Sequence, residues 1–234
     1  MWAMGKGATV SEGGAMRERA ILFSSPKIRA ILDDRKTMAR EVVKPQPEPE
    51  WWPVQNTVAG CTDAVFLEEG SNAGQRIEHR IRCPYRVGMS LWVRETWQTC
   101  SGGYVPGVRF VADGTEVFPE FENLDALPRD WQDFNKKRSP IHMPRWVSRI
   151  TLEVVSVRVE RVQEISEADA KAEGVTPDLE DSGGQNQDGS WISIPRYVYS
   201  FRDLWDSIHA KRGYGWDANP LVWVVEFRRA GQEK

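Results

Sequence analysis

The stretch VSRITLEVVSVRVERV, from Val147 to Val162, carries the strongest β-strand signal in this chain of 234 residues. Its first apolar positions, Ile150, Leu152 and Val154, alternate with other residues, which is typical of a strand with one buried face. From Val155 onward the apolar positions are displaced by one residue. A β-bulge or a sharp bend near Val154 is the simplest cause, because successive side chains of a strand point to opposite faces.

Helical patterns lie on both sides of this strand. Ser25 can cap a helix that Pro26 suits at its first position, with apolar residues at helical spacing after it. The segment SEADAKAEG (166–174) predicts a short helix, with a serine cap, Asp169 at the capping-box position and a glycine at its end. The segment YSFRDLWDSIHAKRG (199–213) predicts a longer helix with one apolar face and a basic end.

Three further stretches predict strands. SLWVRETW (90–97) alternates in the way of a strand, and LVWVVEFRR (221–229) closes the chain with a strongly apolar face. RFVADGTEVF (109–118) predicts a hairpin that turns at Asp113 and Gly114. Strands and helices follow one another in mixed order, so we predict an α+β fold with a small curved mixed β-sheet or β-barrel and flanking helices.

The chain is long enough for one large domain. Residues 1–15 lack periodicity and predict a disordered tail or an upstream start, which leaves 16–234 as a single domain. Weakly patterned insertions are expected at about 44–85 and 99–143. A third insertion, 177–194, is polar and rich in glycine, and we expect it to be a mobile loop.

Composition excludes several classes of protein. The chain has no apolar run of membrane-spanning length and no signal-peptide pattern, so we expect a soluble protein of the cytoplasm with no membrane partner. Cys61, Cys83 and Cys100 form neither a CxxC pair nor an even set, which predicts reduced thiols and no structural zinc. Phosphate-loop, dinucleotide and metalloprotease motifs are absent as well, and we expect no cofactor and no metal.

The net charge of −3 hides a strong segregation of charge. Residues 135–149 hold five bases and no acid, and residues 76–94 hold five arginines and one acid. If these segments meet in the fold, they form a surface that binds anions; if they are scattered, they are only solvated.

Six stretches together resemble one family, the phage and prophage branch of the ASCH domain proteins in the PUA-like superfamily. The resemblance implies a small β-barrel with helices around a cleft, and binding of RNA or modified bases in a bacterial host cell; some phage relatives are labelled morphogenetic protein. The stretches are ILFSSPKIRAILDDRKT (21–37), GMSLWVRETW (88–97), IHMPRWVSRITLEV (141–154), ISEADAKAEGV (165–175), FRDLWDSI (201–208) and VWVVEFRR (222–229).

The family's signature consists of a glycine, a lysine two positions later, an acid or threonine three positions after the lysine, and an arginine two positions after that. In this chain those positions hold Asp34, Lys36, Ala39 and Glu41, so only the lysine matches. Relatives that deacylate acetylcytidine use this lysine as base, a threonine three residues later as nucleophile, and a glutamate from a later helix as proton donor. The resemblance therefore assigns the first and third roles to Lys36 and Glu173, whereas Ala39 has no oxygen to serve as nucleophile.

Each catalytic candidate has an alternative structural interpretation. Lys36 is either a cleft residue or a basic residue that complements the end of a helix. Thr37 could replace the missing nucleophile only if the backbone is irregular, because adjacent residues do not share a helix face. Glu95 is either buried with an arginine partner or directed into the cleft. Glu173 is either the proton donor or a solvated helix-end carboxylate.

The segment IHMPRWVSR offers hydrogen bonds, charge and a stacking plane within nine residues. Arginines that contact phosphate and a tryptophan that stacks on a base would suit a single-stranded or flipped nucleotide. The alternative is a core tryptophan with solvated arginines. The residues expected to bind a ligand are Lys36, Arg40, Arg94, Glu95, His142, Arg145, Trp146 and Arg149.

Three hypotheses of function follow. The leading one is a module that binds RNA, single-stranded nucleic acid or a modified nucleoside in a basic cleft. The second is a hydrolase acting on acylated cytidine or RNA, with Lys36 as base, Thr37 or water as nucleophile, and Glu173 or Glu95 as acid. The third is a virion-assembly or host-interaction protein that contacts a protein partner through its Trp-rich insertions, which contain Trp51, Trp52 and Trp131.

Overall fold

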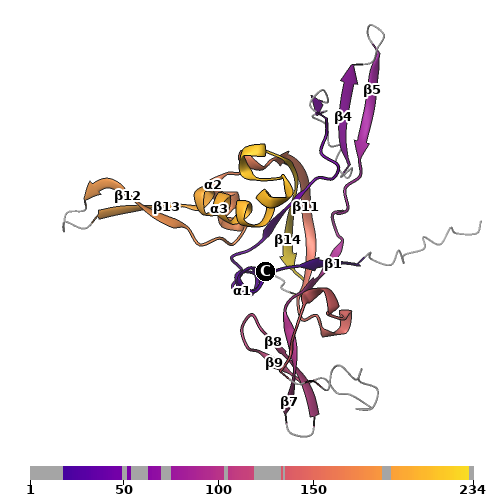
Figure 1. The fold of residues 1–234 in the computed structure, drawn as a ribbon, viewed down its shortest axis with the longest axis vertical. Coiled ribbons are helices and arrows are strands. Elements are labelled where there is room, and N and C mark those ends of the chain that lie inside the picture. Colours follow the sequence, from indigo (N-terminus) through magenta and orange to yellow (C-terminus); the bar gives the residue numbers. More distant parts are fainter. Residues whose placement is uncertain are drawn as a thin grey trace, which may run out of the picture.

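The computed structural model describes residues 18–48, 52–53, 63–69, 75–102, 105–118, 133, 135–185 and 191–231. The predicted tail, residues 1–15, lies outside this set. A central sheet and its helices form the body of the molecule, and three groups of strands extend from it as arms (Figure 1). None of the described helices is long and apolar enough to cross a membrane.

The central sheet has five strands and is mixed. The first two strands in its order run parallel, and the other neighbours run antiparallel. The α+β class is thus confirmed, but the described strands form an open sheet with two edges, and no closed barrel is found among them. From edge to edge the strands are β1 (Glu18–Leu22), β6 (Ser90–Arg94), β11 (Thr151–Arg161), β14 (Leu221–Arg229) and β2 (Met38–Val42).

The predicted bulge is confirmed in β11. The register between β11 and β14 shifts between Val154 and Ser156, and Val155 is left 41% exposed. The extra residue keeps Val157 on the same buried side of the sheet as Val154, against the main core.

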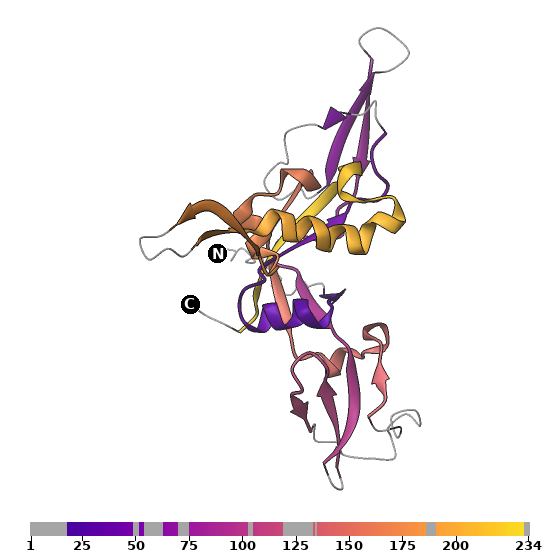
Figure 2. The same cartoon turned by 60° about the vertical axis from the view of Figure 1, so that its left-hand side comes forward.

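Helices cover the two faces of the sheet differently. On one face, α1 (Ser25–Leu32) packs its buried isoleucines into the main core. On the other face, α2 (Glu167–Ala172) and α3 (Tyr197–His209) pack against β2, β14 and the end of β11. Figure 2 shows α1 apart from α3, with strands of the sheet passing between them.

The α2–α3 face is covered over only part of its width. No residue of β1 or β6 belongs to the core cluster beneath these helices. The register aligns Ala20, Trp92 and Thr151 across β1, β6 and β11 on this face, opposite the buried Leu91 and Val93. The β1–β6 end of this face therefore lies outside the helix-covered core.

Local signals at the helix ends were mostly accurate. Ser166 caps α2 by accepting a hydrogen bond from the Asp169 backbone N–H, as predicted. Ser25 does not cap α1: Ser24 precedes the helix instead, and its side chain makes no capping hydrogen bond. The third helix begins two residues before its predicted start, at Tyr197. Short 3-10 helices cover Pro140–His142, Arg145–Val147, Val162–Glu164, Ala210–Arg212 and Trp216–Ala218.

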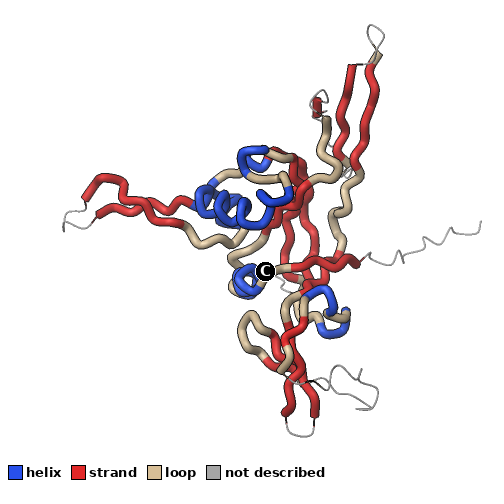
Figure 3. Tube along the Cα trace, viewed as in Figure 1, coloured by secondary structure: helices blue, strands red, loops and turns tan. Residues whose placement is uncertain are grey.

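The insertions form the arms, which consist of strands (Figure 3). The predicted hairpin at Asp113 and Gly114 is confirmed, whereas the predicted strand 90–97 is interrupted at Glu95 and Thr96. The prediction of a loop at 177–194 was wrong, because two segments of this region pair antiparallel as strands. Their polar, Gly-rich sequence carries no clear strand pattern. The arm strands are β3 (Trp52–Pro53), β4 (Ala64–Glu69), β5 (Arg76–Ile81), β7 (Trp97–Gly102), β8 (Val105–Phe110), β9 (Glu116–Val117), β10 (Lys137–Arg138), β12 (Asp178–Gln185) and β13 (Trp191–Arg196).

Candidate functional site

Lys36 is completely buried and its ammonium group is saturated. Its Nζ donates to the Met38 carbonyl at 2.5 Å, to the Glu173 carbonyl at 3.0 Å and to Glu173 Oε2 at 2.7 Å. A lysine ammonium has three N–H donors, so all of them are used. Burial lowers the pKa of Lys36, and the Glu173 carboxylate opposes this effect.

Glycine at position 174 allows the chain after α2 to approach Lys36 closely. Gly174 has a φ of +77°, and a Cβ there would lie 2.8 Å from the Cβ atoms of Ala30 and Lys36. The approach is completed by a hydrogen bond from the Thr37 N–H to the Ala172 carbonyl, 2.9 Å long. The Lys36–Glu173 pair is thus formed by backbone contacts as well as by charge.

Arg40 extends this pair into a larger group, which we call the Lys36 network. Arg40 Nη2 lies 3.0 Å from Asp169 Oδ2, and Nη1 lies 3.4 Å from Glu173 Oε1. Arg158 aligns with Arg40 across the sheet through Val224, and it lies 2.8 Å from Asp169. The network consists of Lys36, Arg40, Arg158, Glu160, Asp169, Glu173 and Glu226.

This composition decides the charge of the region around Lys36. Three cations meet four carboxylates, so the network is not a basic surface. The side chains of Lys36 and Arg40 are fully buried, and those of Arg158 and Glu226 are about one third exposed, at 36% and 35%. The Lys36 network therefore joins α2 to the sheet as a paired structure that is most exposed at Arg158 and Glu226.

Neither Ala39 nor Thr37 supplies Lys36 with the hydroxyl nucleophile that the deacylase relatives use. Ala39 is 5% exposed and belongs to the main core, on the face of β2 opposite to Met38 and Arg40. Thr37 is exposed, and no hydrogen bond between its hydroxyl and Lys36 exists in the described residues.

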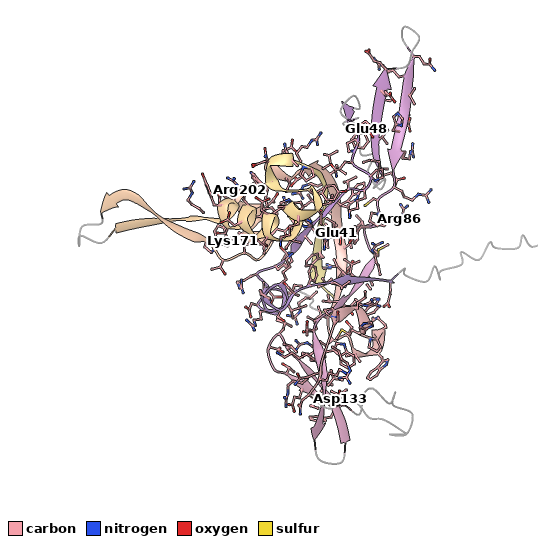
Figure 4. All side chains as sticks on the ribbon, in the orientation of Figure 1. Glu41, Glu48, Arg86, Asp133, Lys171 and Arg202 are labelled. Carbon is pink, nitrogen blue, oxygen red and sulfur yellow. The ribbon has the colours of Figure 1, made fainter. Side chains whose placement is uncertain are left out.

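A pocket of about 590 Å³ lies beside the Lys36 network. The turn after α1 contributes Asp34 and Arg35, α2 contributes Lys171, and α3 contributes Tyr197. Figure 4 shows Lys171 on the helical side of the molecule, in a different part from Asp133. The remaining lining is mainly apolar and consists of Ala168, Ala172, Val175, Thr176 and Pro177.

Glu95 and Arg149 form a separate, structural pair. Arg149 binds both Glu95 oxygens at 2.9 and 3.0 Å, binds Asp113 at 2.8 Å, and lies 4.1 Å over the Phe110 ring. Burial raises the pKa of Glu95, whose side chain is 1% exposed, although Arg149 opposes the shift. Of the two interpretations of Glu95, the buried arginine pair is the one observed.

Of the remaining predicted ligand residues, Arg94 and Arg145 meet at Trp92, at the β1–β6 end of the α2–α3 face, and His142 and Trp146 are chain neighbours of Ile141 and Arg145 there. Arg94 lies 4.5 Å and Arg145 lies 5.8 Å from the centre of the Trp92 ring. Trp146 is 53% exposed and is not a core residue. We call this region the Trp92 surface; it comprises Leu22, Trp92, Arg94, Ile141, His142, Arg145 and Trp146.

The two arginines of the Trp92 surface differ in how many of their N–H groups have a partner. Arg145 binds both oxygens of Glu18, at 2.8 and 2.9 Å. Arg94 donates from Nη1 to the Ile141 carbonyl at 3.2 Å, but its buried Nε has no acceptor among the described residues. Buried donors without an acceptor are rare in proteins.

The structure thus divides the predicted site residues among three places. Lys36, Arg40 and Glu173 meet in the Lys36 network; Arg94, His142, Arg145 and Trp146 belong to the Trp92 surface; Arg149 pairs with both Glu95 and Asp113. The sequence reasoning missed Trp92, although it alternates with Leu91 and Val93 and shares the face of Arg94. It also missed Tyr197 and Lys171 of the pocket, which carry no local signal.

Comparisons with protein-family models, curated proteins and solved structures find no match to this chain. The resemblance to ASCH domain proteins therefore stays a prediction. Among the described residues, no group of histidine, cysteine, aspartate or glutamate side chains is arranged to hold a metal ion. Cys83 and Cys100 are buried and form no disulfide among the described residues, and Cys61 lies outside those residues.

Proposed function

We propose that this chain binds single-stranded nucleic acid, RNA in particular, on the Trp92 surface, as an ASCH-like domain of a phage or prophage. The observation that carries the proposal is the meeting of two arginines at one aromatic ring: Arg94 and Arg145 lie 4.5 and 5.8 Å from the centre of the Trp92 ring. Guanidinium groups beside an aromatic plane can bind the oxygens of a phosphate or a base. The exposed ring of Trp146 offers a plane on which an unpaired base can stack.

The positive charge around Trp92 supports a nucleic acid strand, rather than an apolar molecule, as the ligand. Arg94 belongs to the basic segment 76–94 and Arg145 to the basic segment 135–149, so parts of both segments meet at Trp92. Binding that relies on phosphate contacts releases counterions and weakens as salt increases.

The test is fluorescence anisotropy of labelled single-stranded RNA and DNA across a salt series. We expect salt-dependent binding by the parent chain and a loss of roughly tenfold or more in affinity for Trp146→Ala, because one base stack contributes about 1–3 kcal/mol. Arg94→Gln should weaken binding and reduce the salt dependence, whereas Arg202→Gln, an exposed arginine on α3, should do neither. Absence of salt-dependent binding at low ionic strength would overturn the proposal.

The pocket beside the Lys36 network favours a second candidate, a modified nucleoside as ligand. Its size fits a small ligand, and Tyr197, Asp34 and Arg35 could stack on a base, bind a sugar hydroxyl and bind an anionic group. Saturation-transfer NMR with acetylcytidine would test this, with Tyr197→Ala expected to remove the transfer. Transfer that persists in Tyr197→Ala and disappears in Trp146→Ala would place the nucleoside on the Trp92 surface instead.

The hydrolase alternative rests on the meeting of Lys36 with Glu173, which lie beside this pocket and are not among the residues that line it. In that reaction water adds across the acyl amide, and acetate and cytidine are released. Lys36 would first have to give up a proton and one of its three hydrogen bonds. Release of cytidine by the parent chain, lost in folded Lys36→Gln, would favour hydrolysis; no release by the parent chain would exclude it for this substrate.

The strand arms favour the third candidate, contact with a protein partner in virion assembly or at the host. These arms extend from the body (Figure 3), and β3 contains Trp52, while Trp51 and Trp131 lie outside the described residues. Co-purification with a protein that survives nuclease treatment would support this role. Loss of the partner after nuclease treatment would point back to nucleic acid.

A further inference from the structure

Arg145 of the Trp92 surface already binds a carboxylate. Its Nε lies 2.8 Å from Glu18 Oε2 and its Nη2 lies 2.9 Å from Glu18 Oε1, so the guanidinium group binds both oxygens at once. The two residues are 127 positions apart in the chain. Two parallel N–H···O bonds of this kind are also the geometry in which arginine binds a phosphate group. Glu18 therefore occupies the edge of Arg145 that a phosphate would bind.

Strand β1 brings Glu18 to this position. Glu18 is the first residue of β1, and it shares a face of the sheet with Ala20, which aligns with Trp92 of β6. Arg145 reaches the same face from the short 3-10 helix that it begins, and it lies 5.8 Å from the centre of the Trp92 ring. The carboxylate and the aromatic ring are thus two neighbours of one guanidinium group.

The contact between Glu18 and Arg145 is not needed to hold β1 on the sheet. All five residues of β1 pair with β6, and the following N–H, that of Phe23, donates to the Arg94 carbonyl at 3.1 Å. Ile21 is buried in the main core. The side chains of Arg145 and Glu18 are 42% and 45% exposed, and ion pairs this exposed contribute little to stability. Breaking the contact therefore costs the fold little.

Arg149 shows the opposite arrangement. It belongs with Arg145 to the segment 135–149, which contains no acid, so both arginines take their carboxylate partners from elsewhere in the chain. The Arg149 side chain is 16% exposed and that of its partner Glu95 is 1% exposed, so a ligand from solvent has no access to that carboxylate. Glu95 is thus a fixed partner, whereas Glu18 is accessible and can be replaced.

The Glu18 carboxylate and a nucleic acid phosphate offer Arg145 the same chemistry. Hydrogen bonds from Arg145 lower the pKa of Glu18, so this carboxylate is charged near neutral pH. A phosphodiester also carries one negative charge and offers oxygens that accept hydrogen bonds. Arg145 cannot bind both anions through the same N–H groups, and a displaced carboxylate beside the strand would repel its phosphates.

We propose that Glu18 is an internal competitor of the nucleic acid strand, which must displace it to form the two-bond phosphate contact with Arg145. This inference rests on the strand binding proposed above, and it gives Glu18 the role of limiting the affinity of that site. Loss of the Glu18 charge would then strengthen binding without any new contact residue.

The test is the affinity of Glu18→Gln for a labelled single-stranded oligouridylate, measured by fluorescence anisotropy across a salt series. Glutamine keeps the length of the side chain and removes its charge, so we expect binding about fivefold tighter than that of the parent chain at low salt. The slope of log affinity against log salt should become steeper by about 0.7, since one more cation is free to contact the strand.

Glu78→Gln is the matched control for the loss of one negative charge. Glu78 forms an exposed ion pair with Arg80 on β5, in the β4–β5 arm, so this variant should change neither the affinity nor the salt slope. Glu18→Gln should unfold at the same temperature as the parent chain, because the lost ion pair is exposed. Equal affinities of Glu18→Gln and Glu78→Gln would overturn the inference and leave strand binding intact.

A double-mutant cycle shows whether the effect passes through Arg145. In the Arg145→Gln background, Glu18→Gln should raise the affinity by less than about twofold, since the competition no longer exists. An equal gain with and without Arg145 would show that Glu18 acts only through general repulsion, and would contradict the competition.

Carbon NMR of the glutamate carboxyl groups observes the displacement directly. Saturating oligouridylate should move the Glu18 signal toward that of a solvated glutamate and leave the Glu78 signal in place. A strand that binds with salt dependence but leaves the Glu18 signal unchanged would contradict the competition alone. Absence of salt-dependent binding by both the parent chain and Glu18→Gln would overturn the proposed function as well.

Discussion

Lys36 and Glu173 are 137 positions apart in the chain, yet Lys36 Nζ lies 2.7 Å from Glu173 Oε2. Both side chains are nearly completely buried, at 0% and 5% exposure. The contact joins the turn after α1 to the end of α2, and Arg40 connects the same carboxylate to the sheet. It therefore holds a helix on the sheet.

A double-mutant cycle would measure this pair. Glu173→Leu alone leaves Lys36 buried without its counter-charge, so it should lower the free energy of unfolding by about 3–5 kcal/mol. Lys36→Met alone leaves Glu173 with only its longer contact to Arg40, at 3.4 Å, and should also be destabilising, but less so. The double variant should recover much of that loss, because neither charge then remains unpaired. Urea unfolding gives these values; losses that simply add in the double variant would show that the two residues are not coupled.

Ala39→Thr tests whether the site is a disabled enzyme. Ala39 is packed in the main core, so threonine would bury a hydroxyl and extra volume there and should cost roughly 1–3 kcal/mol of stability. The new hydroxyl would enter the opposite face of β2 from Arg40, and we expect no hydrolysis of acetylcytidine. Cytidine release measured by chromatography, with thermal unfolding alongside, checks both parts; appearance of turnover would restore the enzyme hypothesis.

Gly174→Ala should be much more harmful than Gly213→Ala. Both glycines have a positive φ, +77° and +80°, so alanine is strained at either position. Only at Gly174 would the new Cβ meet other atoms, the Cβ atoms of Ala30 and Lys36 at 2.8 Å. We expect a loss of about 1 kcal/mol for Gly213→Ala and at least about twice that for Gly174→Ala. Equal losses would show that the close approach of Gly174 to Ala30 and Lys36 does not affect stability.

Asp113→Asn should change how stability depends on pH. Burial by itself would raise the pKa of Asp113, but hydrogen bonds from Arg149 and Thr115 hold it at about 2. Because this pKa is below its value in the unfolded chain, the carboxylate stabilises the fold above about pH 4, and that stabilisation is lost as the pH falls toward 2. The group is partly solvated, so we expect a loss of about 1 kcal/mol near neutral pH.

Denaturant unfolding at several pH values would measure the effect. The stability difference between Asp113→Asn and the parent chain should shrink as the pH is lowered. Asp33→Asn, in an exposed ion pair with Arg35, provides the control and should have little effect. A difference that is constant with pH would mean that the charge of Asp113 does not contribute.

Local patterns in the sequence predicted the elements well where neighbouring residues decide them. The displaced alternation in 147–162 predicted the bulge near Val154, since the period of a strand is set by its own backbone. Ser166 and the Asp113–Gly114 turn were found for the same reason. The hairpin of β12 and β13 was missed because it depends on pairing between two segments, neither of which alternates clearly on its own.

The sequence by itself determined the α+β class, the positions of the helices α1, α2 and α3, the strands β6, β11 and β14, and the hairpin of β8 and β9. Only the tertiary structure decided the partners of the charged side chains: Lys36 with Glu173, Glu95 with Arg149, and Arg94 with Trp92. The reason is physical. Secondary structure follows from backbone geometry over a few residues, whereas the state of a charge depends on its burial and on side chains that the fold brings to it from far along the chain.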